Sequence, residues 1–218
     1  MLTYQAQSFR ASATTTRMRI TGGSLRSRVL RAPRGSSTRP TSDRVRESLF
    51  GILESAGRVQ GARVLDLYAG TGALALEALS RGASRATLVE SSREALAVAR
   101  GNVASLGMED RARVVAAAAR AAVRRGAGGG PFDLVLADPP WALVDSGEAV
   151  HVLADLARSG LLSENALVVL EHAARTPSPE IAALANDQSR RYGDTALTFY
   201  KPAILARPRI EDEGPTSE

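Results

Sequence analysis

The 218-residue sequence contains no cysteine, which excludes disulfide bonds, thiolate metal ligands and a cysteine nucleophile. Only two histidines occur, His151 and His172, and neither has a partner at metal-ligand spacing, so we expect packing or surface roles and no metal site. No apolar run approaches the roughly 18 residues of a membrane span, and the first residues lack the apolar core of a signal peptide. We therefore expect a cytoplasmic protein without a membrane segment.

Aromatic residues make up only 4% of the chain, but hydrophobic residues make up 44%, enough for the core of one domain. The charge is unevenly distributed. Residues 1–60 carry eleven arginines and three acidic residues, a net charge of +8, whereas the remainder has a net charge of −3. A basic arm on a mildly acidic body predicts a polyanionic partner, and the alternative is a solvated basic tail.

From Arg63 onward, apolar strand-like segments alternate with segments of helical periodicity. Strands are predicted at 63–67, 86–89, 112–116, 132–137 and 166–171, helices at 73–81, 92–106, 117–125 and 148–158, and an antiparallel hairpin at 188–192 and 195–201. Near-continuous apolar strands are typical of a parallel sheet covered on both faces. The pattern predicts an α/β fold whose sheet is mostly parallel, with seven strands and an antiparallel hairpin at the C-terminal end.

The composition divides the chain into four parts. Residues 1–17 are a polar tail that we predict to be disordered, as are residues 204–218. Residues 18–60 form a basic extension, with a small β-hairpin (19–21 and 28–30) and a helix that begins at Thr41-Ser42-Asp43. Residues 61–203 form the α/β body.

A glycine turn follows the first strand of this body. The strand runs into Ala69-Gly70-Thr71-Gly72, and a helix begins at once. Such a turn offers unpaired N–H groups and a positive dipole end, and its glycines let a ligand approach the backbone closely. In open α/β sheets this is a nucleotide site. Glu90, which ends the next strand, is suited to hold ribose hydroxyl groups.

The same turn fits the loose dinucleotide pattern, so a NAD-dependent oxidoreductase is a competing interpretation. Two features disfavour it. Asp66 lies inside the first strand, where a dinucleotide fold usually has an apolar residue, and its carboxylate is suited to the amino group of a methionine moiety. The second is Asp138-Pro139-Pro140-Trp141 after the fourth strand, which hydride transfer does not require.

This tetrad predicts a site for an exocyclic amino group. Neither proline has an N–H group, and Pro139 disfavours a helical Asp138, so the turn is stiff. The Asp138 carboxylate and the Pro139 carbonyl group are two acceptors for one amino group. Trp141 offers a flat face on which a base can stack. An ordinary turn is the alternative for the two prolines, and surface packing is the alternative for Trp141.

On these residues the chain resembles class I methyltransferases that use S-adenosylmethionine and act on amino groups of nucleic-acid bases. Met18-Arg19-Ile20-Thr21-Gly22-Gly23, the segment from Arg39 to Glu47 and the segment from Leu65 to Gly72 further resemble the RsmD family. The likeness extends from about Met18 to Pro202. It implies a Rossmann-like fold and methylation of guanine N2 in small-subunit (16S) ribosomal RNA.

The resemblance also implies residue roles. Asp138, Pro139 and Trp141 would hold the target base, and the cofactor would lie against Asp66, Tyr68, Ala69, Gly70, Gly72, Glu90 and Asp138. RNA contacts are expected from Trp141 and from arginines of the basic extension, namely Arg19, Arg26, Arg28, Arg31, Arg39 and Arg44. We expect a monomer that binds the small ribosomal subunit or its RNA. The same tetrad also suits adenine N6 of DNA or other RNA, and a nucleic-acid-binding module without activity stays a further alternative.

Overall fold

The computed structural model describes residues 18–32 and 43–203. The predicted tails (1–17 and 204–218), Arg39 and the predicted helix start at Thr41-Ser42 lie outside these ranges. The strands are β1 (Arg63–Leu67), β2 (Arg85–Glu90), β3 (Ala112–Ala116), β4 (Phe132–Ala137), β5 (Leu162–Ala173), β6 (Leu184–Tyr192) and β7 (Thr195–Pro202). The helices are η1 (Gly23–Leu25), α1 (Asp43–Ser55), α2 (Ala73–Ser80), α3 (Arg93–Ser105), α4 (Ala119–Arg124), α5 (Trp141–Asp145) and α6 (Glu148–Arg158).

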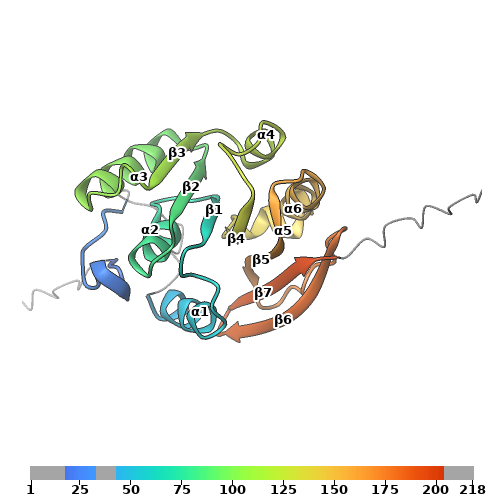
Figure 1. The fold of residues 1–218 in the computed structure, drawn as a ribbon. Coiled ribbons are helices and arrows are strands. Elements are labelled where there is room, and N and C mark those ends of the chain that lie inside the picture. Colours follow the sequence, from blue (N-terminus) through green and yellow to red (C-terminus); the bar gives the residue numbers. More distant parts are fainter. Residues whose placement is uncertain (1–17, 33–42, 204–218) are drawn as a thin grey trace, which may run out of the picture.

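The seven strands form one sheet in the order β3-β2-β1-β4-β5-β7-β6 (Figure 1). Strands β1 to β5 are parallel, whereas β7 runs antiparallel to both β5 and β6. The predicted α/β fold, with a mostly parallel sheet and a C-terminal antiparallel hairpin, is therefore confirmed. The chain reverses its strand order between β1 and β4, which is where open α/β sheets bind their ligands.

Helices cover both faces of the sheet, which explains the continuous apolar strands. On one face α1, α2 and α3 join residues 18–32, the N-terminal segment, in a single core with residues such as Val64, Leu88 and Leu136. On the other face α4, α5 and α6 pack against residues such as Leu65, Val89 and Val135. Within the described ranges, every helix is too short or too polar to cross a membrane.

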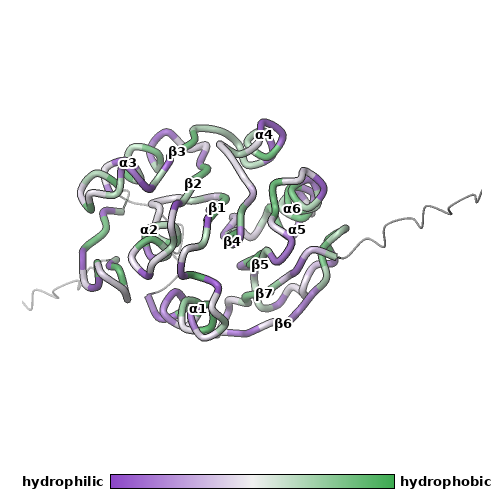
Figure 2. Tube along the Cα trace, in the orientation of Figure 1, coloured by the Kyte–Doolittle hydropathy of each residue, from purple (hydrophilic) through white to green (hydrophobic). Residues whose placement is uncertain are grey.

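Strands β5 and β6 are longer than predicted. The first four residues of β6 (184–187) include Asn186 and Asp187, residue types that are rare in strands. The sequence pattern therefore does not predict a strand at these residues. Pairing with β7 carries them into the sheet, where β6 forms a mostly hydrophilic edge (Figure 2).

The predicted N-terminal hairpin is reduced to a single antiparallel bridge between Arg19 and Val29, closed by the short helix η1. Helix α2 accounts for the difference. The buried Glu77 carboxylate accepts hydrogen bonds from the N–H groups of Thr21 and Gly22, both at 2.8 Å. These N–H groups are therefore not available for hydrogen bonds between two strands. The segment is thus held by a side chain of the body.

Candidate active site

The predicted glycine turn and the predicted double-proline turn lie at the same rim of the sheet. In register, Leu67 of β1 pairs with Val89 of β2 and with Ala137 of β4. Because these strands are parallel, the residues that follow or end them, including Glu90 and Asp138, meet at one edge. This shared rim is the candidate active site.

Gly70 and Gly72 meet different surroundings within the turn. Gly72 is the N-cap of α2 with φ of 80°, and a Cβ atom there would lie 2.7 Å from Leu88 Cδ2, so the glycine allows α2 to pack closely on β2. Gly70 has φ of 54°, but a Cβ atom there would come no nearer than 3.9 Å to any group outside its chain neighbours. No group therefore crowds the Gly70 Cα atom, so a ligand can approach the backbone there closely.

Asp66 places a half-satisfied carboxyl group beneath this turn. Its side chain is fully buried, and Oδ2 accepts a hydrogen bond from the N–H group of Ala75 in the first turn of α2 at 3.0 Å. Within the described residues, Oδ1 has no hydrogen-bond partner. Burial raises the pKa of Asp66 to about 8, and the carboxylates of Asp138 and Glu90 add to the rise. A cationic ligand group would relieve both the unpaired oxygen and the desolvation.

Tyr68 holds a second unpaired polar atom. It has a positive φ of 64°, which turns the chain out of β1 toward the glycines. Its hydroxyl group is buried and finds no hydrogen-bond partner among the described residues. Burial raises the pKa of Tyr68 to about 12, with a further contribution from the negative charge of Glu148.

Glu90 is bound to the glycine turn itself. Its Oε2 atom accepts the N–H group of Gly70 at 2.8 Å, and Oε1 accepts the N–H groups of Ser91 and Ser92, each at 2.8 Å. Oε2 keeps a second lone pair for a ligand hydroxyl group. The sequence suggested only a ribose contact for Glu90, whereas the structure adds a link between β2 and the turn.

The double-proline turn leads directly into a helix that the sequence did not predict. Pro139 is buried, Pro140 is the N-cap of α5, and Trp141 is its first residue. The Arg175 guanidinium lies 5.8 Å from the centre of the Trp141 ring and donates a hydrogen bond to Asp145 at 3.0 Å. One side of Trp141 is thus occupied by a residue 34 positions away, which no local sequence pattern could indicate.

The arginines predicted to bind RNA are exposed wherever they are described: Arg19, Arg26, Arg28, Arg31 and Arg44. Asn102 of α3 connects the N-terminal segment, through Arg31, to the glycine turn. Its amide group accepts a hydrogen bond from the Arg31 N–H at 2.9 Å and donates to the carbonyl groups of Arg31 and Thr71 at 3.1 and 2.9 Å. Sequence reasoning missed Asn102, although an asparagine among the apolar positions of a helix is a usable signal.

His172 has a packing environment, as expected. It is buried between the Ala173 carbonyl group and the Thr198 hydroxyl group, 3.0 and 2.9 Å away, and burial lowers its pKa. Across residues 18–32 and 43–203, no three histidine, aspartate or glutamate side chains are gathered as metal ligands would be.

Residues 18–201 match the family described as "Conserved hypothetical protein 95". The chain is 39% identical to "Ribosomal RNA small subunit methyltransferase D" of Escherichia coli K12, over 76% of this chain and 80% of that protein. The chain belongs to the RsmD family. Members of the RsmD family are methyltransferases, and the cofactor is S-adenosylmethionine, which removes the dinucleotide alternative.

Solved structures agree with this assignment. The Escherichia coli protein yhhF superposes with a TM-score of 0.74 at 34% identity, covering 85% of this chain and 98% of that one. A hypothetical protein from Thermus thermophilus gives a TM-score of 0.72 at 34% identity, covering 84% and 99%. The RsmD cofactor also suits the site described above: the Gly70 backbone can be approached closely, and Asp66 Oδ1 and the Tyr68 hydroxyl group are buried polar atoms without a hydrogen-bond partner among the described residues.

Proposed function

We propose that this protein transfers a methyl group from S-adenosylmethionine to the exocyclic N2 of a guanine in small-subunit ribosomal RNA. The observation that carries the proposal is the shared rim, where the open glycine turn and Asp138-Pro139 follow adjacent parallel strands. The RNA substrate is supported by the curated relatives, whose names specify the small ribosomal subunit. Such a substrate would place the protein in the cytoplasm, and we propose that it acts as a monomer.

The cofactor-binding residues we propose surround the glycine turn. Asp66 would pair with the cationic amino group of the methionine moiety, and Glu90 Oε2 would accept a ribose hydroxyl group. The remaining contacts would come from Tyr68, Ala69, Gly70, Gly72 and Asp138. When bound, S-adenosylmethionine supplies a methyl group on a positively charged sulfur, so that no further activation of the donor is needed.

Asp138 and Pro139 would act on the nucleophile. The lone pair of a base amino group is delocalised into the ring, which makes the nitrogen a poor nucleophile. Hydrogen bonds from the amino group to the Asp138 carboxylate and the Pro139 carbonyl would favour a pyramidal nitrogen and stabilise the positive charge that develops on it. Asp138 would also accept the released proton. Trp141 would stack on the base, a contact typically worth about 1–3 kcal/mol.

The arginines of the basic extension would bind phosphate groups of the RNA. Arg19, Arg26, Arg28, Arg31 and Arg44 are exposed, and Arg39 is included from the sequence alone. Asn102 hydrogen-bonds to both the N-terminal segment and the glycine turn, so it would link the proposed RNA-binding residues to the proposed cofactor-binding residues.

Substitution of Asp138 tests the assignment. Asp138→Ala is expected to abolish methyl transfer while leaving S-adenosylmethionine affinity largely intact, because the carboxylate is needed for the amine and the other cofactor contacts remain. Labelled methyl transfer and equilibrium dialysis of the cofactor measure the two effects. Glu164→Gln, an exposed position near the start of β5, is the matched control and should keep full activity. Turnover of Asp138→Ala at the wild-type rate would refute the proposal.

The substrate is tested by offering naked ribosomal RNA, assembled small subunits and DNA to the wild-type enzyme, followed by nucleoside analysis. The proposal expects methylated guanine from one of the two RNA substrates. N6-methyladenine as the product, from DNA or RNA, would instead establish the adenine alternative.

A further inference from the structure

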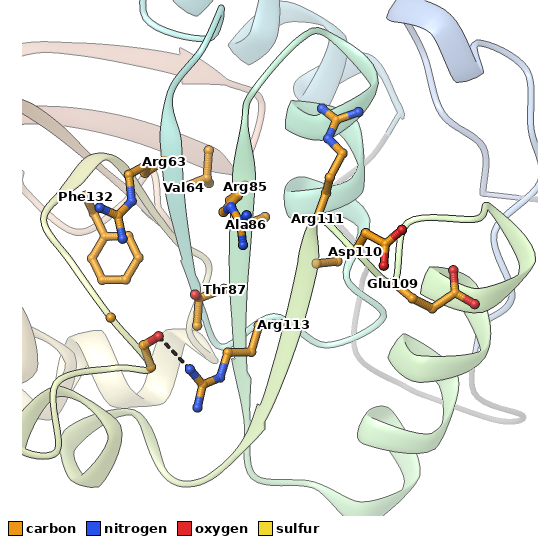
Figure 3. A pocket seen from close by; sticks show the side chains of 13 residues that line it. Arg63, Val64, Arg85, Ala86, Thr87, Glu109, Asp110, Arg111, Arg113 and Phe132 are labelled. Atoms are coloured by element: carbon orange, nitrogen blue, oxygen red, sulfur yellow. Dashed lines mark hydrogen bonds between the residues drawn. The ribbon is translucent and has the colours of Figure 1, made fainter.

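A cavity of about 300 Å³ lies at the opposite rim of the sheet, where the parallel strands begin (Figure 3). The first residues of four strands line it, namely Arg63, Arg85, Ala112 and Phe132. Because a strand rises about 3.3 Å per residue, the length of β1 separates this rim from the candidate active site by roughly 15 Å. The cavity is therefore distinct from the methyl-transfer site.

Three arginines from adjacent strands point to one face of the sheet at this cavity. Arg63 pairs in register with Arg85, and Thr87, two residues after Arg85, pairs with Arg113. Side chains two residues apart share a face of the sheet. Figure 3 accordingly shows the three guanidinium groups around Thr87. Like charges on neighbouring strands destabilise a sheet, so this arrangement calls for a compensating anion.

Among the described residues, no acidic side chain forms an ion pair with these arginines. On the neighbouring strand β4, Asp133 Oδ2 accepts the backbone N–H group of Arg63 at 2.9 Å and not its guanidinium group. Arg111, a fourth lining arginine, donates hydrogen bonds to the carbonyl groups of Leu79 and Ser84. It thereby satisfies backbone acceptors at and after the C-terminal end of α2. In the described part of the chain, the guanidinium groups of Arg63 and Arg85 have no hydrogen-bond or ion-pair partner. The two acidic residues of the lining, Glu109 and Asp110, form no ion pair with them there. Figure 3 shows both acids beyond Arg111, on the side away from Arg63.

A glycine-rich loop forms one wall and lets the arginines approach it. Arg113 donates a hydrogen bond to the Gly128 carbonyl group at 2.8 Å. A Cβ atom on Gly128 would lie 3.2 Å from Arg113 Nε, and one on Gly129 would lie 3.9 Å from Arg63 Nη2. Side chains on this loop would crowd or screen the guanidinium groups, whereas glycines leave them facing the cavity.

We propose that this cavity binds a phosphate group, carried either by a small phosphorylated molecule or by a nucleic-acid backbone. Guanidinium groups bind phosphate oxygens through paired N–H donors, and the Thr87 hydroxyl group adds a further donor. The volume lies at the lower end of the range of small-molecule sites, which is about 300–1,000 Å³. The inference does not depend on methyl transfer. If the protein bound phosphate in this cavity but methylated no RNA, the proposed phosphate site would still hold.

Calorimetric titration with pyrophosphate tests the free-ligand source. Pyrophosphate is expected to bind the wild-type protein, and Arg63→Gln/Arg85→Gln should weaken binding by about tenfold for each arginine removed. Arg190→Gln, an exposed arginine on β6, is the matched control and should bind as the wild type does. The single variant Arg85→Gln provides the same test with one charge removed. Both variants should melt no earlier than the wild type, because they relieve a like-charge pair.

Titration with a short oligouridylate at several salt concentrations tests the backbone source. If the cavity holds a backbone phosphate, Arg63→Gln/Arg85→Gln lowers oligouridylate affinity and makes the dependence of log K on log salt shallower by about 0.7 for each phosphate that is no longer bound. An effect on pyrophosphate alone assigns the site to a small phosphorylated molecule. Unchanged affinity for both probes in folded Arg63→Gln/Arg85→Gln would overturn the inference.

Discussion

The carboxyl group of Asp66 shows how one residue can carry a pH dependence. Its pKa in the folded chain is about 8, against 3.8 for the unperturbed group, so the folded protein holds a proton that the unfolded chain releases. The stability this proton contributes is fully present below about pH 3.8 and is lost as the pH rises through about 8. At pH 7 the ligand-free protein therefore holds Asp66 mostly protonated.

We predict that S-adenosylmethionine binding at pH 7 releases roughly one proton, because the cationic amino group of the ligand favours the Asp66 carboxylate. Calorimetry in buffers of different ionisation enthalpy measures this release. At pH 9.5 Asp66 is already ionised, so Asp66 should contribute no proton to the release there. Binding enthalpies at pH 7 that are the same in every buffer would contradict a role for Asp66 at the cofactor.

Gly70 offers a second test at the residue scale, with Gly57 as its control. Both residues have positive φ, 54° and 66°, and a Cβ atom on either would meet no close neighbour. Gly70→Ala and Gly57→Ala should therefore lose similar stability, about 1–2 kcal/mol, in chemical denaturation. Only Gly70→Ala should lose cofactor affinity, by tenfold or more, since Gly70 belongs to the cofactor site that we propose and Gly57 does not. Equal cofactor affinities for the two variants would show that the ligand lies elsewhere.

At the scale of elements, α2 and α3 hold the N-terminal segment to the body. Buried Glu77 of α2 binds Thr21 and Gly22, and it also pairs with Arg46 of α1 at 3.3 Å and Arg81 at 2.7 Å. Ile20 and Leu30 lie in the same core as α1 and α2. The segment that carries the exposed arginines is thus positioned by the helices beside the glycine turn.

We predict that Asn102→Ala lowers the free energy of unfolding by about 2 kcal/mol, because it leaves backbone groups of Arg31 and Thr71 without partners. It should also weaken cofactor binding through the released turn. Ser105→Ala, one turn further along α3, removes only a hydrogen bond to the Asn102 carbonyl group and should change stability by less than about 0.5 kcal/mol. Urea denaturation measures the free energy of unfolding of both variants. Equal losses of stability would show that the hydrogen bonds of the Asn102 amide do not stabilise the fold.

At the scale of the whole molecule, positive charge is concentrated in residues 1–60, the N-terminal part of the chain, while the rest of the chain is mildly acidic. Arg26 and Arg44 are exposed arginines of that part. We predict that Arg26→Gln/Arg44→Gln weakens RNA binding and makes the salt dependence of log K shallower by about 1 for each residue. Filter binding across a salt series measures this, with Arg190→Gln as the control. A salt dependence identical to that of the wild type would exclude phosphate contacts by these two residues.

Most of the fold was determined by the sequence alone, because strands and helices follow local periodicity. The apolar centres of the strands, the glycine turn and the double proline lie where they were predicted, although β5 extends beyond its predicted bounds, and parallel strands necessarily bring their ends to one rim. The polar start of β6 and helix α5 could not be predicted in this way, since pairing and packing partners decide them.

Only the tertiary structure decided the contacts between distant residues. Glu77 accepts backbone N–H groups that the predicted hairpin would have used between its strands. Asn102 links the N-terminal segment to the glycine turn, and Arg175 covers one side of Trp141. The arginine cavity likewise exists only because register places Arg63 beside Arg85. Hydrogen bonding, burial and charge at these positions depend on partners 22 to 71 residues away in the chain, so they are established only when the chain folds.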